Sequence, residues 1–302
     1  MSKPSPVGTV MIKAARDAGR SLARDFGEVE HLQVSRKGPA DFVSNADHRA
    51  EDIIYESLTK ARPGYGFLME ERGVVEGTDK SNRFIVDPLD GTLNFLHGQP
   101  HYAVSIGLER EGKLFCGVVY DVAKNEIFWA ETGRGAWLDQ RKLIVAGRKR
   151  IEEAVVATGT PWIGKSEGAH RRFAREIASM TPVCAGIRRY GSAALDLAYV
   201  AAGRFDGFWE RGLKPWDIAA GIVLVREAGG FVEELDGGDV QTTGNILAAN
   251  EPLLPKIKEQ LRGAHRARLS SPGHHACPVR RFCQLPSRRS GLPGEWWRGG
   301  AR

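Results

Sequence analysis

The sequence lacks any apolar run of about 18 residues or more, which is close to the length that a membrane-spanning helix requires. Its first residues, as far as Pro6, also lack the apolar core of a secretory signal peptide. We therefore expect a chain that works in the cytoplasm and makes no contact with a membrane.

Cysteine is scarce, with four residues in a chain of 302. Cys116 and Cys184 stand among apolar neighbours, so we expect them to be reduced residues of the core. Cys277 and Cys283 lie near two histidines, but their spacing matches no common structural zinc pattern. A structural zinc site is therefore not expected.

The main body of the chain also lacks an excess of charge. The whole sequence has 43 Lys and Arg against 37 Asp and Glu, a net charge of +6. Residues 264–302 hold eight Arg, no Lys and one acid, which leaves 35 basic and 36 acidic residues in residues 1–263. A groove for a nucleic-acid backbone therefore has no support from the composition of the main body.

Residues 264–302 differ in kind from the rest of the sequence. They are rich in Arg, Ser, Pro and Gly and show no apolar period, which predicts a disordered tail. A basic arm that binds nucleic acid is an alternative. A shifted reading frame or read-through from a vector would also explain the abrupt change of composition.

Apolar periodicity predicts the main elements. The spacing predicts amphipathic helices over residues 7–26 and 45–61. Short apolar runs separated by turn residues between 102 and 138 favour an antiparallel sheet. From residue 151, strands alternate with helices as far as a last helix over 253–261. The pattern is that of an α/β protein.

A change of pattern near residues 145–152 suggests a division of the chain. We expect an N-terminal α+β half over residues 1–150 and a C-terminal α/β half over residues 151–263, followed by the tail. With 42% apolar and 26% charged residues, the composition is ordinary for a globular protein that buries a large core.

The segment from Arg83 to Phe95 is the most informative stretch. Phe84–Val86 reads as a covered strand, and Pro88 and Gly91 stop it in a turn. Asp87 and Asp90 then stand at the end of the strand, and Thr92 and Asn94 are expected to cap a following helical turn whose free N–H groups favour an anion. Carboxylate oxygens and anion donors are thus expected to meet.

Two other interpretations of this segment stay open at this point. Asp-Pro and Asp-Gly pairs are common in plain turns. A phosphatase of the haloacid-dehalogenase type also ends a strand in Asp, Gly and Thr, but it needs two aspartates separated by one residue, as nucleophile and acid. Here two residues separate Asp87 from Asp90, which favours shared cations and water activated by metal.

Further carboxylates occupy similar settings. Glu70 follows the apolar run Phe67–Met69, Asp47 opens the second helix, and Asp217 follows Trp216 at a helix start. Taken singly, each has a plain explanation as a strand-end acid or as an acid in a first helical turn. Together with Asp87 they form the kind of oxygen-rich set that Mg²⁺ prefers.

The segments Met69-Glu-Glu71, Asp87-Pro-Leu-Asp-Gly-Thr92 and Trp216-Asp-Ile-Ala-Ala-Gly221 with Glu227-Ala-Gly-Gly230 resemble, in this order, the signature segments of the inositol monophosphatase family. Gly191-Ser-Ala-Ala194 and Phe208-Trp-Glu210 are also similar to family segments. The resemblance runs from about residue 7 to about residue 262. It implies a layered α-β-α-β-α sandwich, usually in a homodimer.

The resemblance also implies the roles of particular residues. The metal ligands would be Glu70, Asp87, the carbonyl of Leu89, Asp90 and Asp217. The attacking water would be positioned by Glu70 and by Thr92, which Asp47 orients. Phosphate would be bound by the N–H groups of Gly91 and Thr92, and the substrate would also meet Asp90, Ala193, Glu210 and Asp217.

The activity that the resemblance implies is hydrolysis of a small phosphate monoester with about two or three Mg²⁺ ions per site, sensitive to lithium. Inositol monophosphate is the favoured substrate. Fructose bisphosphate, histidinol phosphate and nucleotide 3′-phosphates are alternatives, as is a mainly regulatory role in RNA-related machinery. One departure concerns Met69, which stands where the family commonly has Gly. If Met69 strained the backbone, the position of Glu70 would be affected.

Overall fold

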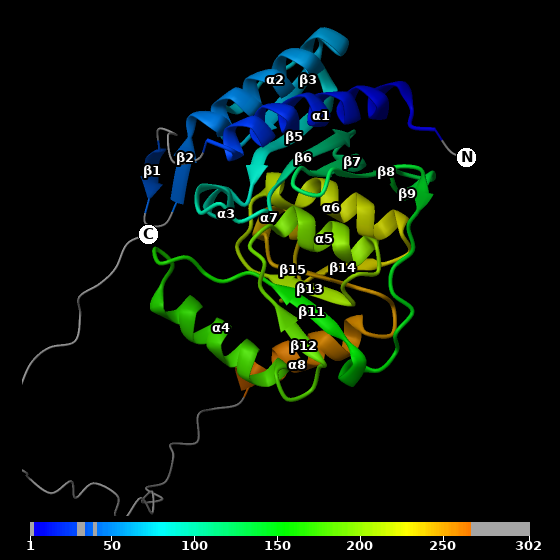
Figure 1. Ribbon diagram of the computed structural model, residues 1–302. Coiled ribbons are helices and arrows are strands. Elements are labelled where there is room, and N and C mark those ends of the chain that lie inside the picture. Colours follow the sequence, from blue (N-terminus) through cyan, green and yellow to red (C-terminus); the bar gives the residue numbers. More distant parts are fainter. Residues whose placement is uncertain (1–2, 29–33, 39–40, 267–302) are drawn as a thin grey trace, which may run out of the picture. The chain divides into compact units, whose positions relative to one another are not determined.

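Five layers stack in the order helices, sheet, helices, sheet, helices (Figure 1). The computed structural model describes residues 3–28, 34–38 and 41–266, and the predicted tail lies almost wholly outside them. The α/β class and the layered sandwich expected from the sequence are confirmed.

The first helix layer and the first sheet form the N-terminal part of the fold. Helices α1 (Pro6–Phe26) and α2 (Asn45–Ala61) cover a sheet with strand order β10-β9-β8-β7-β6-β5-β3-β4. The strands are β3 (Tyr65–Met69), β4 (Gly73–Val75), β5 (Asp79–Asp90), β6 (Ala103–Arg110), β7 (Lys113–Asp121), β8 (Glu126–Glu131), β9 (Gly135–Leu138) and β10 (Arg141–Lys142). A short hairpin, β1 (Val34–Gly38) and β2 (Asp41–Ser44), precedes α2, and α3 (Thr92–Leu96) follows β5.

The second sheet carries the C-terminal part of the fold. A 3-10 turn (Ile151–Glu153) leads into a sheet with order β12-β11-β13-β15-β14. Its strands are β11 (Val155–Thr158), β12 (Gly186–Arg188), β13 (Gly207–Glu210), β14 (Phe231–Glu234) and β15 (Ile246–Ala249). Helices α5 (Ala193–Ala201) and α6 (Pro215–Glu227) lie between the two sheets, α4 (Glu167–Met180) and α8 (Leu254–Arg266) cover the outer face, and α7 (Val240–Thr243) is a single turn.

Alternation along the strands assigns side chains to different cores. On β6, Val104, Ile106 and Leu108 pack toward α1 and α2, whereas Ala103 packs toward α5 and α6. A third core fills the space between the second sheet and helices α4 and α8. The middle core contains residues of both sheets, so side chains from both expected halves of the chain share one apolar cluster.

Two glycines let α6 lie directly against the first sheet. A Cβ atom at Gly117 would stand 2.4 Å from the carbonyl oxygen of Ala220, and one at Gly107 would stand 2.8 Å from Cβ of Ala219. Such distances are too short for any side chain, so only glycine permits this approach. The N-terminal turn of α6 is thereby held near the ends of β5 and β6.

Most predicted elements are present, and the differences have physical causes. The helix expected over residues 45–61 is observed with those bounds. The first sheet is antiparallel except between β3 and β5, which are parallel because the chain reverses direction into β4 and again before β5, on the other side of β3. Strand β5 begins at Asp79, which pairs with Tyr65 of β3, and Asn82 pairs with Arg110 of β6. Apolar patterning does not reveal such pairings of polar residues.

Two minor expectations also have outcomes. Cys116 is buried and free, and Cys184 is half-buried and free, as expected for reduced cysteines. Among residues 3–28, 34–38 and 41–266, no helix combines the length and apolar character needed to cross a membrane. The basic tail with Cys277 and Cys283 lies outside the described residues.

Candidate functional site

The parallel pairing of β3 and β5 brings the first two acids together. Met69 is the register partner of Val86, and the chain then continues into Glu70 on one strand and Asp87 on the other. The Glu70 N–H donates to the Val86 carbonyl oxygen at 3.1 Å, which keeps Glu70 beside the end of β5. Met69 is fully buried within a regular strand, so it leaves Glu70 at the strand end without backbone strain.

Asp217 comes to the same place from α6. It occupies the first turn of this helix, where its Oδ2 accepts from the Lys214 N–H at 2.7 Å. The preceding residue is tied to the first sheet, since Ser105 Oγ donates to the Trp216 carbonyl oxygen at 3.2 Å. The close packing of α6 against β6 and β7 therefore determines the position of the Asp217 carboxylate.

The electrostatics show that these acids lie near one another. Burial, followed by the charges of Glu70, Asp90 and Asp217, raises the pKa of Asp87 well above its usual range. The pKa of Asp217 is raised in the same way by burial and then by Asp90. Four carboxyl groups at one end of the sheet thus destabilise one another when all are ionised.

The donor set is chemically suited to a hard cation. Mg²⁺ and similar ions prefer oxygen ligands, and a cation would relieve the mutual repulsion of the carboxylates. Among the described residues, no three or more Asp, Glu, His or Cys side chains lie close enough together to hold a metal ion as they stand. Ionised carboxylates repel one another, and binding a cation would reverse that force.

Thr92 and Asp47 form a polar pair next to the acid cluster. Thr92 Oγ1 lies 3.2 Å from Asp47 Oδ1 and 3.0 Å from the Leu89 carbonyl oxygen, both of which can accept its hydrogen. The other Asp47 oxygen accepts from the backbone N–H and the hydroxyl of Ser44, at 2.9 and 2.6 Å. Burial raises the pKa of Asp47, which makes its carboxylate a better proton acceptor.

The turn after Asp90 differs in detail from the expectation. Gly91, with φ of 94°, stands at the cap position of α3, and its carbonyl accepts the Phe95 N–H at 3.0 Å. The expectation that Thr92 and Asn94 cap this helix is therefore wrong. Asn94 Nδ2 instead donates to the carbonyl oxygens of His101 and Tyr190, at 2.8 and 2.7 Å, and so links this turn to the segment before α5.

Asp90 is held by the N-terminus of α5. Its Oδ2 accepts from Ser192 Oγ at 2.5 Å and from the Ala194 N–H at 2.8 Å. Burial raises the pKa of Asp90 to about 6, and the hydrogen bonds from Ser192, Ala194 and Ala193 oppose that rise. The predicted substrate residue Ala193 is thus placed at Asp90, at the first turn of α5.

Glu210 ends β13 on the other side of Asp90. A Cβ atom at Gly159 would lie 1.8 Å from Glu210 Oε1, so the carboxyl group packs directly on the backbone of Gly159. Burial and then the charge of Asp90 raise the pKa of Glu210 to about 8, while the Arg189 guanidinium opposes the shift. Glu210 and Asp90 are therefore neighbours, although 120 positions separate them in the sequence.

Three residues at this site were not among those predicted from the sequence. Ser192 donates to Asp90, and Arg189, which is hydrogen-bonded to Thr160 Oγ1 at 2.8 Å, lies near Glu210. Asp196 is buried and near Glu210 and Asp90, and neither of its carboxylate oxygens has a hydrogen-bond partner. The only sequence signal for them was their place in the small-residue segment 191–194 or beside it.

Comparisons with known proteins identify the family of the chain. A model of the inositol monophosphatase family matches residues 3–269. An inositol-1-monophosphatase from Mesorhizobium japonicum is 57% identical over 257 residues, which are 83% of this chain and 96% of that protein. The crystal structure of the extragenic suppressor protein suhB from Bartonella henselae has a TM-score of 0.83 at 54% identity, covering 85% of this chain and 99% of that one.

The chain therefore belongs to the inositol monophosphatase family. A further relative, the Nus factor SuhB of Escherichia coli, is 41% identical over 264 residues, which are 86% of this chain and 98% of that protein. The resemblance recognised in the sequence is thus confirmed.

Proposed function

We propose that this protein is a phosphoric monoester hydrolase that releases phosphate from a small polyol phosphate, with inositol monophosphate as the favoured substrate. The observation that carries the proposal is the set of carboxylates around Asp87, whose pKa is raised first by burial and then by Glu70, Asp90 and Asp217. The name of the Mesorhizobium relative, at 57% identity, supports the choice of substrate.

The residues that would hold Mg²⁺ are Glu70, Asp87, the carbonyl of Leu89, Asp90 and Asp217. When bound, the metal supplies a Lewis acid that polarises the ester and favours the ionisation of water. The Leu89 N–H donates to Asp87 Oδ1 at 2.9 Å, which fixes the orientation of that carboxylate. Asp87 therefore presents its remaining carboxylate lone pairs in a fixed direction.

Glu70, Thr92 and Asp47 would orient the attacking water. Thr92 Oγ1 donates its hydrogen to Asp47 Oδ1 or to the Leu89 carbonyl, which leaves its lone pair free to accept from water. Asp47 is itself held by Ser44, so the Thr92 hydroxyl has few orientations. Such positioning lowers the entropic part of the barrier.

The N–H groups of Gly91 and Thr92 would bind the phosphate oxygens. Helix α3 has only five residues, so its dipole is small and the individual N–H donors would do most of the binding. The left-handed backbone of Gly91 turns the chain sharply away from Asp90 at this point.

The leaving alcohol would lie between Asp90, Glu210 and the first turn of α5. Glu210 and the Ala193 backbone would meet its hydroxyl groups, and Asp90 and Asp217 would lie at the ester oxygen. Because Glu210 packs on Gly159, its carboxyl group has a defined position from which to select a hydroxyl-rich substrate.

The test is phosphate release from inositol 1-phosphate during a Mg²⁺ titration, beside a panel of the alternative esters. We expect Asp87→Asn and Asp217→Asn to lose turnover while retaining the folded circular dichroism spectrum. Glu233→Gln, which removes an acid paired with Lys258 away from the cluster, is the matched control and should retain turnover. If the protein released phosphate from none of the esters in the panel, the proposal would be refuted.

The finer properties expected from the family belong to the same proposal. They are about two or three Mg²⁺ ions per site, inhibition by lithium and a homodimer. Competition of Li⁺ with Mg²⁺ in the assay, and the mass of the purified protein by light scattering, would test them separately.

A second candidate is a binding role in RNA-related machinery. It is favoured by the relative named as a Nus factor and by the basic composition of residues 264–302. The measurement is RNA affinity as a function of salt, with and without residues 264–302. A flat salt response that deletion leaves unchanged would exclude this role.

A further inference from the structure

A cavity lies beside Glu210. Its volume is about 490 Å³, which is within the range of cavities that bind small molecules. Its walls are the segment around Thr158–Pro161, one face of α4 with the loop before it, Trp209–Gly212 and Asn245. Glu210 is part of this wall and also a neighbour of Asp90.

Four cationic side chains contribute to the lining of this cavity. Lys165, Arg172, Arg175 and Arg211 all reach it, and the only acids in the lining are Glu176 and Glu210. Arg172, Arg175 and Glu176 come from consecutive turns on one face of α4, as helical spacing requires. The cavity therefore carries an excess of positive charge.

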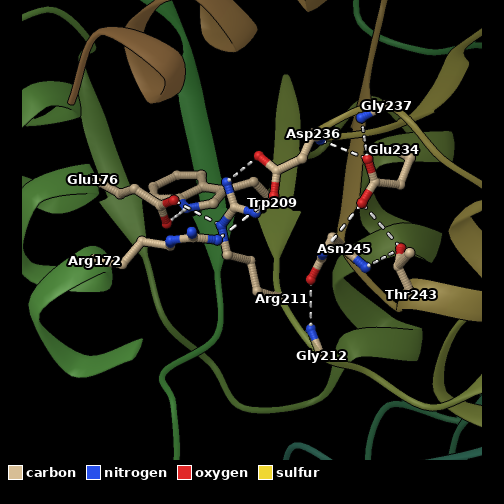
Figure 2. A network of polar contacts seen from close by, with 10 residues as sticks. All are labelled: Arg172, Glu176, Trp209, Arg211, Gly212, Glu234, Asp236, Gly237, Thr243 and Asn245. Atoms are coloured by element: carbon tan, nitrogen blue, oxygen red, sulfur yellow. Dashed lines mark hydrogen bonds and ion pairs between the residues drawn. The ribbon is translucent and has the colours of Figure 1, made fainter. Parts of the chain in front are cut away.

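The Arg211 side chain is held in place by two acids, so its charge is already paired (Figure 2). Its Nε donates to Glu176 Oε1 at 2.7 Å, and its Nη1 donates to Asp236 Oδ2 at 2.7 Å. Glu176 also accepts from Trp209 Nε1 at 3.3 Å. Arg172 Nη1 pairs with Asp236 Oδ2 at 3.5 Å, and Arg211 is held by Glu176, so the cations of the lining that remain are Lys165 and Arg175.

Two of the cations lack an anionic partner. In the described part of the chain, the Arg175 side chain makes no hydrogen bond or ion pair, and the Lys165 ammonium only stacks on Trp162, 3.7 Å from the ring centroid. Burial and the nearby charge of Lys214 lower the pKa of Lys165, so another cation stands close by. Half-buried cations without a partner are the complement of an incoming anion.

The position of Glu210 connects this cavity to the hydrolytic site. An alcohol whose phosphate lies at Asp90 and Gly91 and whose hydroxyl meets Glu210 would have the cavity within reach, because Glu210 both lines the cavity and lies near Asp90. We propose that the cavity is a subsite for a second anionic group, a phosphate or a carboxylate, so that the site also accepts monoesters whose alcohol carries such a group, which inositol monophosphate lacks. The inference rests on the proposed function, since it concerns the alcohol part of esters bound at the same hydrolytic site.

One experiment measures selectivity between matched esters. Glycerol 2-phosphate is paired with 2-phosphoglycerate, which carries a carboxylate, and glucose 1-phosphate is paired with glucose 1,6-bisphosphate, at constant free Mg²⁺. We expect the wild type to have the higher kcat/KM for an anionic member, and the double variant Lys165→Gln/Arg175→Gln to lose about 10- to 100-fold of that preference. The two pairs show whether carboxylate or phosphate is preferred.

The control for this experiment is Arg171→Gln. Arg171 is also on α4, but it is exposed, pairs with Glu167 and does not line the cavity. It should leave the preference between the paired esters at its wild-type value. A double variant that keeps the wild-type preference overturns the subsite.

A binding experiment separates this inference from the catalytic proposal. In EDTA the carboxylate cluster repels anions, so calorimetric titration with inorganic phosphate reports the cavity alone. We expect binding that weakens at least about 10-fold in the double variant and weakens with added salt. Binding in EDTA together with no hydrolysis of any ester would remove the proposed function but support the cavity's anion chemistry. No binding, or equal binding by wild type and double variant, overturns the inference.

Discussion

Replacing Ser192 by Ala tests whether the hydrogen bond from Ser192 orients the Asp90 carboxylate for catalysis. The Ser192 hydroxyl donates to Asp90 Oδ2 at 2.5 Å, and Ser192 is buried. A hydrogen bond to a charged acceptor contributes about 1.5–3 kcal/mol. If it orients Asp90 for catalysis, its loss should lower Mg²⁺-dependent kcat/KM about 10- to 150-fold.

The same substitution should change the pH dependence in a defined direction. The Ser192 hydrogen bond opposes the rise of the Asp90 pKa, which stands at about 6. Without it the pKa rises further, so a proton competes with Mg²⁺ at higher pH. The apparent Mg²⁺ affinity, measured by activity at a series of pH values, should therefore begin to fall at a higher pH in Ser192→Ala than in the wild type.

Two controls isolate this effect from helix stability. Ser192 is also the N-cap of α5, with its hydroxyl 3.4 Å from the Leu195 N–H, and loss of a cap costs about 0.5–2 kcal/mol. Ser5→Ala removes a similar cap from α1, where the Gly8 N–H lies 3.2 Å from Ser5 Oγ, and it should lower the melting temperature without changing kcat/KM. Ser192→Thr keeps the hydroxyl and should restore activity. Equal activity in Ser192→Ala and wild type would refute the reasoning.

Three other outcomes follow from the site. The folded-state pKa of Glu210, about 8, is raised above the unfolded value, so its contribution to stability is present below the unfolded pKa and lost as pH rises through about 8. In EDTA the melting temperature should thus decline as pH rises from about 5 to about 8 and level off above that, with a smaller decline in Glu210→Gln; an equal decline in both proteins would contradict this. Gly159→Ala should push the Glu210 carboxyl aside and raise KM for inositol 1-phosphate about 3- to 10-fold with little change in kcat, whereas Gly147→Ala, which has open space around it, should have no effect; unchanged kinetics in both would show that Glu210 does not meet the substrate. Thr92→Val should lower kcat by about 100-fold and Thr92→Ser by much less, measured at saturating substrate, and a Val variant with wild-type kcat would exclude the hydroxyl from catalysis.

Local sequence carried a large part of the fold. Helix α2 could be placed from its apolar period and from Ser44 and Asp47 at its start, because these interactions act within one turn. The parallel pairing of β3 with β5 could not be placed, since nothing in either strand's pattern specifies its neighbour. Strand bounds such as the early start of β5 were missed for a related reason, because polar residues join a sheet when a partner strand extends beside them.

The candidate site divides in the same way. The spacing of Asp87 and Asp90 favoured shared cations over a nucleophile and acid pair, and Glu70 and Asp217 occupied similar settings at the ends of apolar segments or the start of a helix. Their roles as metal ligands came from the resemblance to the family. The residues that contact those acids could not be predicted from the spacing of the sequence. Ser192 reaches Asp90 across 102 positions, and Glu210 rests on Gly159 because β11 and β13 are parallel neighbours.

The sequence by itself determined which elements form and which oxygen atoms stand at their ends, because turns, caps and apolar periods are properties of near neighbours. Only the tertiary structure decided that these oxygens meet. Glycines 107 and 117 let α6 approach the sheet and carry Asp217 toward Asp87 and Asp90. Burial then raises the pKa of each acid, a consequence of desolvation that exists only once the layers have closed around them.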